Sequence, residues 1–302
     1  MCGLFGLLRS PSAAHPGLAS RVFTLLGVQA EERGRDSAGV ALLSGRASRR
    51  PAPPQATRRP DVQVGGCRVV KGLGRFSEVW RPGLGPSLDG AGLALGHTRF
   101  ATQGGRGRLA NASPLLTGRL AGTHNGDVDA AVLRGRFTLP APAGETDTEA
   151  LYQALAAAGT AAARLDVLAG TVGRAALAWA DRARPDRVHL ARAALSPLTV
   201  AVDSEHNLWW ASNPQWLRVA ERETPVEFRT KALLAEGTYL VIQQGTRPQV
   251  VSRTRFVPVA RPDDLSCQAE IWCGFTPADR ARATTPKLQR HRIEAPAQRS
   301  AA

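Results

Sequence analysis

The chain opens with MCGLFG at residues 1–6, which places a cysteine directly behind the initiator methionine. Methionine aminopeptidases remove Met1 when the second side chain is small, so we expect a mature protein that begins at Cys2. A free thiol has a pKa of about 8.5 and an α-amine about 7.7–8.0, so this one residue would carry both a nucleophile and its base. The other interpretation is that Cys2 is a small buried apolar residue. The glycines at positions 3 and 6 are expected to give the chain end the freedom to fold tightly.

The length of 302 residues allows one large core or two modest ones, and we expect one catalytic domain with a short appendage. No apolar run approaches the roughly 20 residues that are needed to cross a bilayer. The first residues are too few and too poor in basic side chains to form a secretory signal. The sequence therefore predicts a soluble, cytoplasmic protein.

The cysteine spacing and the net charge indicate whether the protein binds a metal ion or nucleic acid. The four cysteines, Cys2, Cys67, Cys267 and Cys273, are too scattered for a disulfide framework and lack the pair spacing of zinc ribbons. We therefore predict no metal and no cofactor. The net charge of +14 suits nucleic acid, but lysine is scarce beside arginine, and no aromatic platforms accompany the basic residues. A solvated basic surface is favoured over a nucleic-acid site.

Hydrophobic periodicity predicts many short strands and few helices. Residues 16–33 and 146–159 have helical spacing, the second with a capping-box pattern at its start. An Arg- and Pro-rich stretch at residues 46–60 is expected to be a mobile loop. Expected strands are 38–43, 62–70, 93–100, 119–124, 172–180, 187–193, 198–202, 207–211 and 237–243, with a short helix from Asn213. Strands in meanders with helices gathered in a few places predict an α+β fold of antiparallel sheets covered by helices.

Polar, glycine-flanked clusters carry the candidate chemistry. They read GHTRFATQG at 96–104, THNGD at 123–127 and GETDTE at 144–149. A thiol that splits an amide needs donors for the developing oxyanion and groups that hold the fixed charges of the substrate. Asn, Arg and Asp side chains in these clusters could supply both.

Together with residues 1–6 and with RGRDSAG at 33–39, these clusters resemble the class II glutamine amidotransferases. That family belongs to the N-terminal nucleophile hydrolases, and its domain is the glutaminase half of glucosamine-6-phosphate synthase and amidophosphoribosyltransferase. Five motifs occur in the order of the family. The resemblance implies a four-layer αββα sandwich, with an amidotransferase domain at residues 2–245 and a C-terminal extension at 246–302 that is partly packed and then disordered.

The resemblance also implies roles. Cys2 would attack the glutamine side-chain amide, with its own α-amine as general base, through a thioester. Asn125 and Gly126 would form the oxyanion hole, although Asn-Gly is also an ordinary turn dipeptide. Arg99 would hold the α-carboxylate of the substrate and Asp147 its α-ammonium.

Other residues of these motifs have supporting roles or open alternatives. Asp147 could instead cap a helix. Thr102 would be a secondary substrate contact. Arg33 and Asp36 are interpreted as an internal ion pair that supports the Cys2 pocket. The histidines at 97 and 124 are interpreted as hydrogen-bonded core residues, because the terminal amine already supplies the base.

Departures from the family pattern concern position 35, where many relatives carry Pro or Tyr, and residues 46–60, which resemble an insertion. Residues 246–302 are too few for a synthase domain. We therefore expect a stand-alone glutamine amidotransferase that passes ammonia to a separate synthase subunit. The alternatives are an amidohydrolase for another γ-glutamyl amide, and a non-catalytic regulatory or binding homologue.

Overall fold

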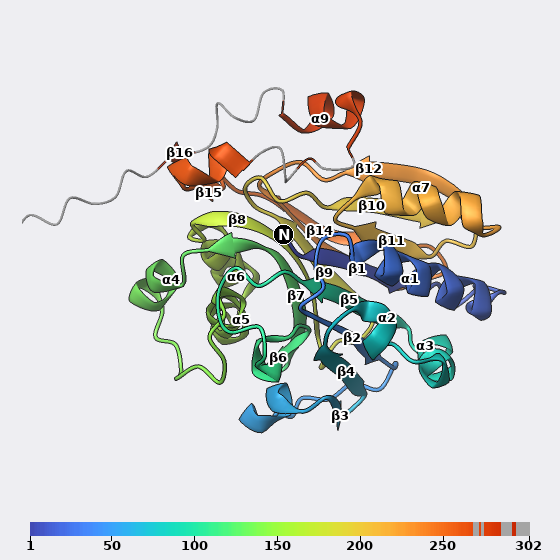
Figure 1. The fold of residues 1–302 in the computed structure, drawn as a ribbon, viewed down its shortest axis with the longest axis horizontal. Coiled ribbons are helices and arrows are strands. Elements are labelled where there is room, and N and C mark those ends of the chain that lie inside the picture. The colour runs from blue at the N-terminus through green and yellow to red at the C-terminus, as the bar shows by residue number, and fades with distance from the viewer. Residues whose placement is uncertain (268–271, 273–274, 285–291, 294–302) are drawn as a thin grey trace, which may run out of the picture.

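The computed structural model describes residues 1–267, 272, 275–284 and 292–293, and Figure 1 shows its two sheets packed face to face between helices. The larger sheet has the strand order β12 (Phe228–Leu233), β10 (Thr199–Asp203), β11 (Leu208–Ala211), β1 (Gly3–Leu8), β5 (Leu93–Arg99), β2 (Ser37–Leu43), β4 (Cys67–Leu73) and β3 (Asp61–Val64). The smaller sheet has the order β14 (Gln249–Arg255), β13 (Thr238–Gln243), β9 (Arg187–Arg192), β8 (Gly173–Asp181), β7 (Leu120–Val128) and β6 (Leu115–Thr117). Neighbouring strands in both sheets are antiparallel.

Helices cover the outer face of each sheet (Figure 1). On the eight-stranded sheet these are α1 (Pro16–Ala30), α2 (Phe76–Val79), α3 (Gly85–Asp89) and α7 (Pro214–Glu223). On the six-stranded sheet they are α4 (Ala130–Arg136), α5 (Asp147–Ala157) and α6 (Ala161–Ala169). The predicted four-layer αββα sandwich is confirmed.

Strand β1 shows how alternation creates the layers. Leu4 and Leu8 belong to the apolar core between the sheets, whereas Phe5 and Leu7 belong to the core beneath the helices. A strand that is buried on both faces is apolar at nearly every position, which is why residues 3–8 lack the alternating pattern of a half-exposed strand. The sequence analysis accordingly did not identify β1, although it lies in the middle of the larger sheet.

Several short elements complete the chain. They are η1 (Pro54–Arg58), η2 (Pro82–Leu84), η3 (Leu109–Asn111), η4 (Pro262–Cys267), α9 (Pro277–Thr284) and the small pair β15 (Val259–Ala260) and β16 (Arg292–Ile293). Residues 46–60, expected to be a mobile loop, contain η1 and are attached to the body by backbone hydrogen bonds from Ser48 to Arg182 and from Ala52 to Gly118, both 2.7 Å long. The expected strand at 62–70 is a hairpin of β3 and β4.

The C-terminal extension begins inside the smaller sheet. Strand β14 follows residue 245 and pairs with β13, so the domain boundary near residue 245 stays a prediction. Residues 285–291 and 294–302, for which disorder was expected, lie outside the described part of the chain. Cys2 and Cys67 are free thiols, whereas Cys273 and the side chain of Cys267 are not among the described groups. No helix in the described ranges has the length and apolar character needed to span a membrane.

Candidate active site

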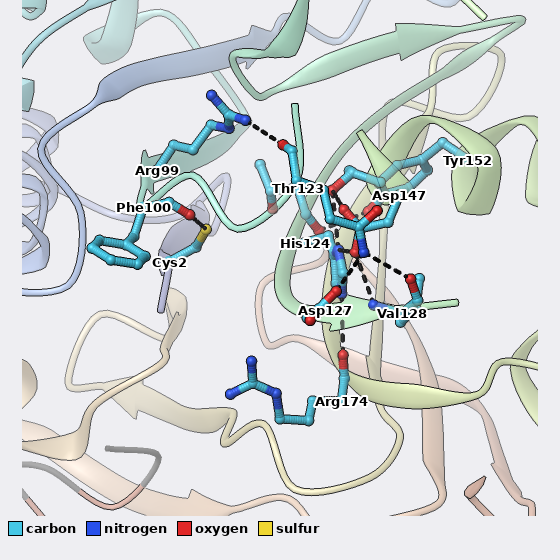
Figure 2. A network of polar contacts seen from close by, with 12 residues as sticks. Cys2, Arg99, Phe100, Thr123, His124, Asp127, Val128, Asp147, Tyr152 and Arg174 are labelled. Carbon is cyan, nitrogen blue, oxygen red and sulfur yellow. Dashed lines mark hydrogen bonds and ion pairs between the residues drawn. The ribbon is translucent and has the colours of Figure 1, made fainter. Parts of the chain in front are cut away.

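Cys2 lies at the start of β1, where the chain enters the middle of the larger sheet between β5 and β11. Its side chain is 8% exposed, and its Sγ donates to the carbonyl oxygen of Phe100 at 3.6 Å (Figure 2). Met1 packs against a small apolar cluster that includes Leu195 and Trp272. The initiator residue is therefore half-buried beside the thiol rather than extended into solvent.

Electrostatics connect Cys2 with the two charged residues expected to bind substrate. Burial raises the pKa of the Cys2 thiol, and the negative charge of Asp147 raises it further. The positive charges of Arg99 and of the chain's amino terminus lower this pKa. Two residues of opposite charge, from elements far apart in the sequence, thus act on one buried sulfur.

The glycines after Cys2 serve close packing. A Cβ on Gly6 would lie 2.0 Å from the Trp210 ring, so only glycine fits in this strand position. Neither Gly3 nor Gly6 has a positive φ angle. The expectation that these glycines supply backbone freedom is therefore wrong, because they are ordinary strand residues that other side chains approach closely.

Arg99 ends β5, and its guanidinium points back over the loop that follows the strand. It donates to the carbonyl oxygens of Gln103 at 2.6 Å, Gly104 at 3.2 Å and Gly105 at 3.4 Å. The residue is only 4% exposed. Burial lowers its pKa, and the nearby Cys2 thiol has the opposite effect. These contacts fix the guanidinium in one orientation.

Asp36 holds the loop after β5 in place. Its backbone amide donates to the Arg99 carbonyl at 3.0 Å, and its carboxylate accepts from the Ala101 amide at 2.8 Å. The same carboxylate forms an ion pair with Arg106 at 3.7 Å. Arg33 lies with its guanidinium 5.9 Å from the centre of the Trp216 ring. Asp36 therefore fixes the loop after β5, and its expected pairing with Arg33 in support of the Cys2 pocket stays a prediction. Thr102, in the same loop, is exposed.

Asn125 lies inside β7, and it is fully buried. Its Nδ2 donates to the Ser212 hydroxyl at 3.2 Å, and that hydroxyl also accepts from the Leu4 amide at 3.0 Å. Ser212 thus connects Asn125 to the strand that begins beside Cys2. The alternative of an ordinary turn at Asn125-Gly126 is wrong, because both residues pair with β8.

Gly126 occupies a position where no side chain fits. A Cβ there would lie 1.9 Å from the carbonyl oxygen of Arg174 and 2.7 Å from the His124 ring. The φ angle of Gly126 is +157°, so strand β8 can approach here only because the residue has no side chain. The lack of space for a side chain explains why position 126 is glycine, although the residue is not in a turn.

Asp147 is the first residue of α5, yet it does not cap that helix. Its Oδ2 accepts from the backbone amide of Val128 at 2.9 Å, across the gap between α5 and the end of β7 (Figure 2). The expected capping box is also wrong. The Thr146 hydroxyl has no hydrogen-bond partner among the described residues, and Glu149 instead accepts from the amides of Ala143 at 2.6 Å and Gly144 at 2.7 Å.

His97 and His124 are buried and hydrogen-bonded, as expected. The His97 ring contacts the His124 carbonyl oxygen at 2.8 Å, and the His124 ring contacts the Thr148 hydroxyl at 3.1 Å. Burial lowers the pKa of His97 to about 3 and also lowers that of His124. Neither imidazole accepts a proton readily at neutral pH.

The sequence analysis missed a polar network beside Gly126. The Asp127 carboxylate accepts from Gln103 at 2.5 Å and from Arg261 at 2.9 Å. Arg261 also binds Asp264, which forms a buried ion pair with Arg174 at 3.3 Å. These contacts join the loop after β5, strand β7 and the C-terminal extension. Arg261 is 134 positions from Asp127 and has no local motif, so only the fold reveals it.

Among the described residues, no group of three or more His, Cys, Asp or Glu side chains could hold a metal ion. The candidate site consists of the buried Cys2 thiol, the Arg99 guanidinium, the Asp147 carboxylate, and the amide groups of Asn125 and Gly126.

Two curated enzymes illustrate what the chain is similar to. The mouse amidophosphoribosyltransferase is 33% identical over 141 residues, which are 45% of this chain and 24% of that enzyme. The glutamine–fructose-6-phosphate aminotransferase (isomerizing) of Symbiobacterium thermophilum is 31% identical over 268 residues, which are 83% of this chain and 38% of that enzyme. The chain is a homologue of the class II glutamine amidotransferases.

The fold of this amidotransferase homologue also matches a solved structure. The glutamine phosphoribosylpyrophosphate amidotransferase from B. subtilis superposes with a TM-score of 0.58 at 20% identity, over 84% of this chain and 49% of that one. No protein-family model matches the chain. The chain spans between about a quarter and two fifths of the length of the two enzymes compared above.

Proposed function

We propose that this amidotransferase homologue hydrolyses glutamine to glutamate and ammonia, with Cys2 as the nucleophile. The observation that carries the proposal is the place of the Cys2 thiol: it donates to the carbonyl oxygen of Phe100, the residue after Arg99, and the charges of Arg99 and Asp147 both influence its pKa. A free amino acid carries a carboxylate and an ammonium on one carbon. A fixed guanidinium and a fixed carboxylate near a thiol are complementary to that head group.

The reaction proceeds in two halves. Once Met1 is removed, the α-amine of Cys2 takes the thiol proton while sulfur bonds to the carbonyl carbon of the side-chain amide. Asn125 and Gly126 donate to the oxyanion that forms. The C–N bond then breaks, the amine returns the proton to the leaving group, and ammonia departs from a γ-glutamyl thioester. Water attacks this thioester with the same amine as base, which releases glutamate and restores the thiol.

Substrate binding uses the remaining residues. Arg99 holds the α-carboxylate, Asp147 holds the α-ammonium, and Thr102 contacts the substrate from the exposed loop. The Arg99 guanidinium and the Asp147 carboxylate are already fixed by backbone groups, so little conformational freedom is lost when glutamine binds.

Ammonia passes to a separate synthase subunit in the cytoplasm. The name of the relative from Symbiobacterium thermophilum states an aminotransferase that uses glutamine and fructose 6-phosphate, and ammonia that escapes to water is lost for such a transfer. Residues 46–60 and the exposed strand β14 supply surface outside the motifs for contact with a partner. Purification of the chain with its native partners tests this step, and recovery of the fully active transferase as this chain alone would contradict it.

Covalent labelling tests the proposed nucleophile. A diazo-ketone analogue of glutamine should add once to the protein, and peptide mapping should place the adduct on Cys2. Cys67→Ala is the matched control, because Cys67 is the other described free thiol, is fully buried and has a pKa raised by burial to about 12. The control should be labelled normally and Cys2→Ala should not be labelled. Labelling that persists in Cys2→Ala would refute the proposal, and turnover of other γ-glutamyl amides as fast as glutamine would favour the broader amidohydrolase.

A further inference from the structure

A cavity of about 720 Å³ lies away from Cys2, between residues 46–59 and β3. In Figure 1 this part of the chain is the light-blue segment beside β3, at the edge of the larger sheet. It is the Arg- and Pro-rich stretch that the family motifs do not include. None of the residues that line the cavity belongs to the candidate active site.

The cavity is positively charged and has no counter-charge. Arg46, Arg50 and Arg59 line it, and none of its described lining residues is Asp or Glu. The side chains of these three arginines form no hydrogen bond or ion pair within the described part of the chain. Their neighbour Arg68, by contrast, binds Asp61 at 2.7 Å. Three arginines that line one hollow therefore keep their guanidinium donors available.

The walls of the cavity are held in place from beneath. The side chain of Arg182, which is 1% exposed, donates to the carbonyl oxygens of Arg50 at 2.7 Å, Gly118 at 2.9 Å and Val64 at 3.3 Å. The Thr57 hydroxyl donates to the Leu116 carbonyl at 3.1 Å. The buried Arg182 side chain thus binds carbonyl groups on both walls of the cavity. The cavity is therefore fixed by the fold and is not a gap under a loose loop.

The remaining lining favours a small organic molecule. Ala56, Val62 and Val64 provide apolar surface next to the charged groups. A guanidinium fork matches phosphate oxygens, and a cavity of this volume suits a small ligand. No aromatic residue lines the cavity in the described structure, so the stacking platforms of single-strand nucleic-acid sites are missing.

We propose that this cavity binds an organic phosphate, a small molecule in which one or more phosphate groups are carried on an apolar or ring-shaped body. The three arginines contact the phosphate, and the alanine and valine side chains contact the body. The site is independent of the glutaminase reaction proposed above.

Binding of 1-naphthyl phosphate to the full chain, followed by its fluorescence and by calorimetry, tests the proposal. We expect one saturable site, with an affinity at least about tenfold higher than that of inorganic phosphate or of 1-naphthol, because each of these offers only half of the contacts. Absence of saturable binding, or equal affinity for inorganic phosphate, would overturn the assignment. Tighter binding of a thymidine oligonucleotide at the same site would assign the cavity to nucleic acid instead.

Variants locate the site. The triple change Arg46→Gln, Arg50→Gln and Arg59→Gln should weaken naphthyl phosphate binding at least tenfold, while Arg253→Gln should leave it unchanged. Arg253 is an exposed arginine on β14, which lies at the opposite edge of the smaller sheet from β6, and η1 lies against β6. An equal loss in both variants would mean that net charge alone attracts the probe. The single variant Arg50→Gln gives the same comparison with the smallest disturbance of the loop.

Discussion

The candidate active site and the arginine-lined cavity both use arginine, but they hold it in opposite ways. Arg99 is buried and donates to three backbone carbonyls within its own loop. Arg50, like its two neighbours in the cavity, is exposed and has no such contacts in the described structure. A group that is fixed by backbone bonds is ready for one geometry, whereas a free guanidinium can adjust to its ligand.

The difference teaches where sequence motifs arise. At the candidate active site each polar side chain contacts several parts of the chain. The residues next to it in the sequence must therefore be glycine, another small residue, or a residue with the required hydrogen-bond donor or acceptor. Such restrictions produce recognisable runs of sequence. In the cavity the buried anchors are Arg182 and Thr57, and the arginines that line the hollow impose no restriction on their neighbours.

The largest expected effect is that of Cys2→Ala. Loss of the nucleophile should reduce glutaminase turnover at least about 10⁴-fold, while the melting temperature should hardly change because the core of β1 begins at Leu4. Steady-state kinetics and thermal denaturation measure the two effects. A variant that unfolds would show that Cys2 has a structural role, and one that retains turnover would exclude it as nucleophile.

Asn125→Ala should lower kcat about 10²–10³-fold, the usual cost of one oxyanion donor. Ser212→Ala is the matched control, since it removes the partner of the Asn125 amide but leaves the amide itself. We expect the control to lose less than about tenfold. Equal losses in the two variants would mean that Asn125 acts only by positioning β1.

Arg99→Lys should raise KM for glutamine about ten- to a hundredfold and change kcat little, because the lysine ammonium cannot reproduce a two-bond contact with a carboxylate. Arg106→Lys, an exposed change in the same loop, should leave KM as it is. An unchanged KM in Arg99→Lys would contradict its assignment to the substrate carboxylate.

Acid should destabilise the active-site region through His97. Its pKa is about 3 in the folded protein because it is buried, against about 6.5 in the unfolded chain. Between these values the unfolded state takes up a proton that the folded state excludes, so the free energy of unfolding falls as pH falls below about 6.5. From pH 7 to pH 5 this one group should cost about 2 kcal/mol. Denaturant unfolding of His97→Gln should show a smaller loss, and an identical pH dependence would refute this account.

The smallest expected effect compares the two kinds of arginine directly. Arg50→Gln should change the free energy of unfolding by less than about 0.5 kcal/mol, as is usual for an exposed group without partners. Arg99→Gln should cost about 1–3 kcal/mol, because the buried guanidinium and its three hydrogen bonds to the loop are lost. Urea denaturation of both variants under one condition gives the comparison. Equal stabilities would remove the distinction between the two sites.

Much of the fold could be predicted from the sequence. Alternation and turn residues indicated most strands, and the Asn213 cap of α7 is confirmed by its hydrogen bond to the Gln215 amide. Strand β1 was not predicted, because it is buried on both faces and lacks the alternating pattern of a half-exposed strand. The predicted capping box does not form, because the Glu149 carboxylate accepts from the amides of residues 143 and 144 instead of from its own helix end. Local sequence does not encode such a tertiary contact.

Only the residues of the candidate site that lie within sequence motifs could be predicted. The residues named from the sequence lie near one another in part: Arg99 and Asp147 both act on Cys2, and Asn125 is linked to β1 through Ser212. Arg261 and Ser212 could not be foreseen, because contacts over 134 and 87 positions leave no local pattern. Thr102 and Arg33 have positions in the structure but no observation that assigns their roles.

The mass of the amino-terminal peptide in active protein tests the central claim most directly. If Cys2 is both nucleophile and base, the active fraction should lack Met1, and the glutamine analogue should add once, to a peptide that begins with Cys2. Full glutaminase activity in protein that still carries Met1 would contradict the account, because the α-amine of Cys2 would then be part of a peptide bond.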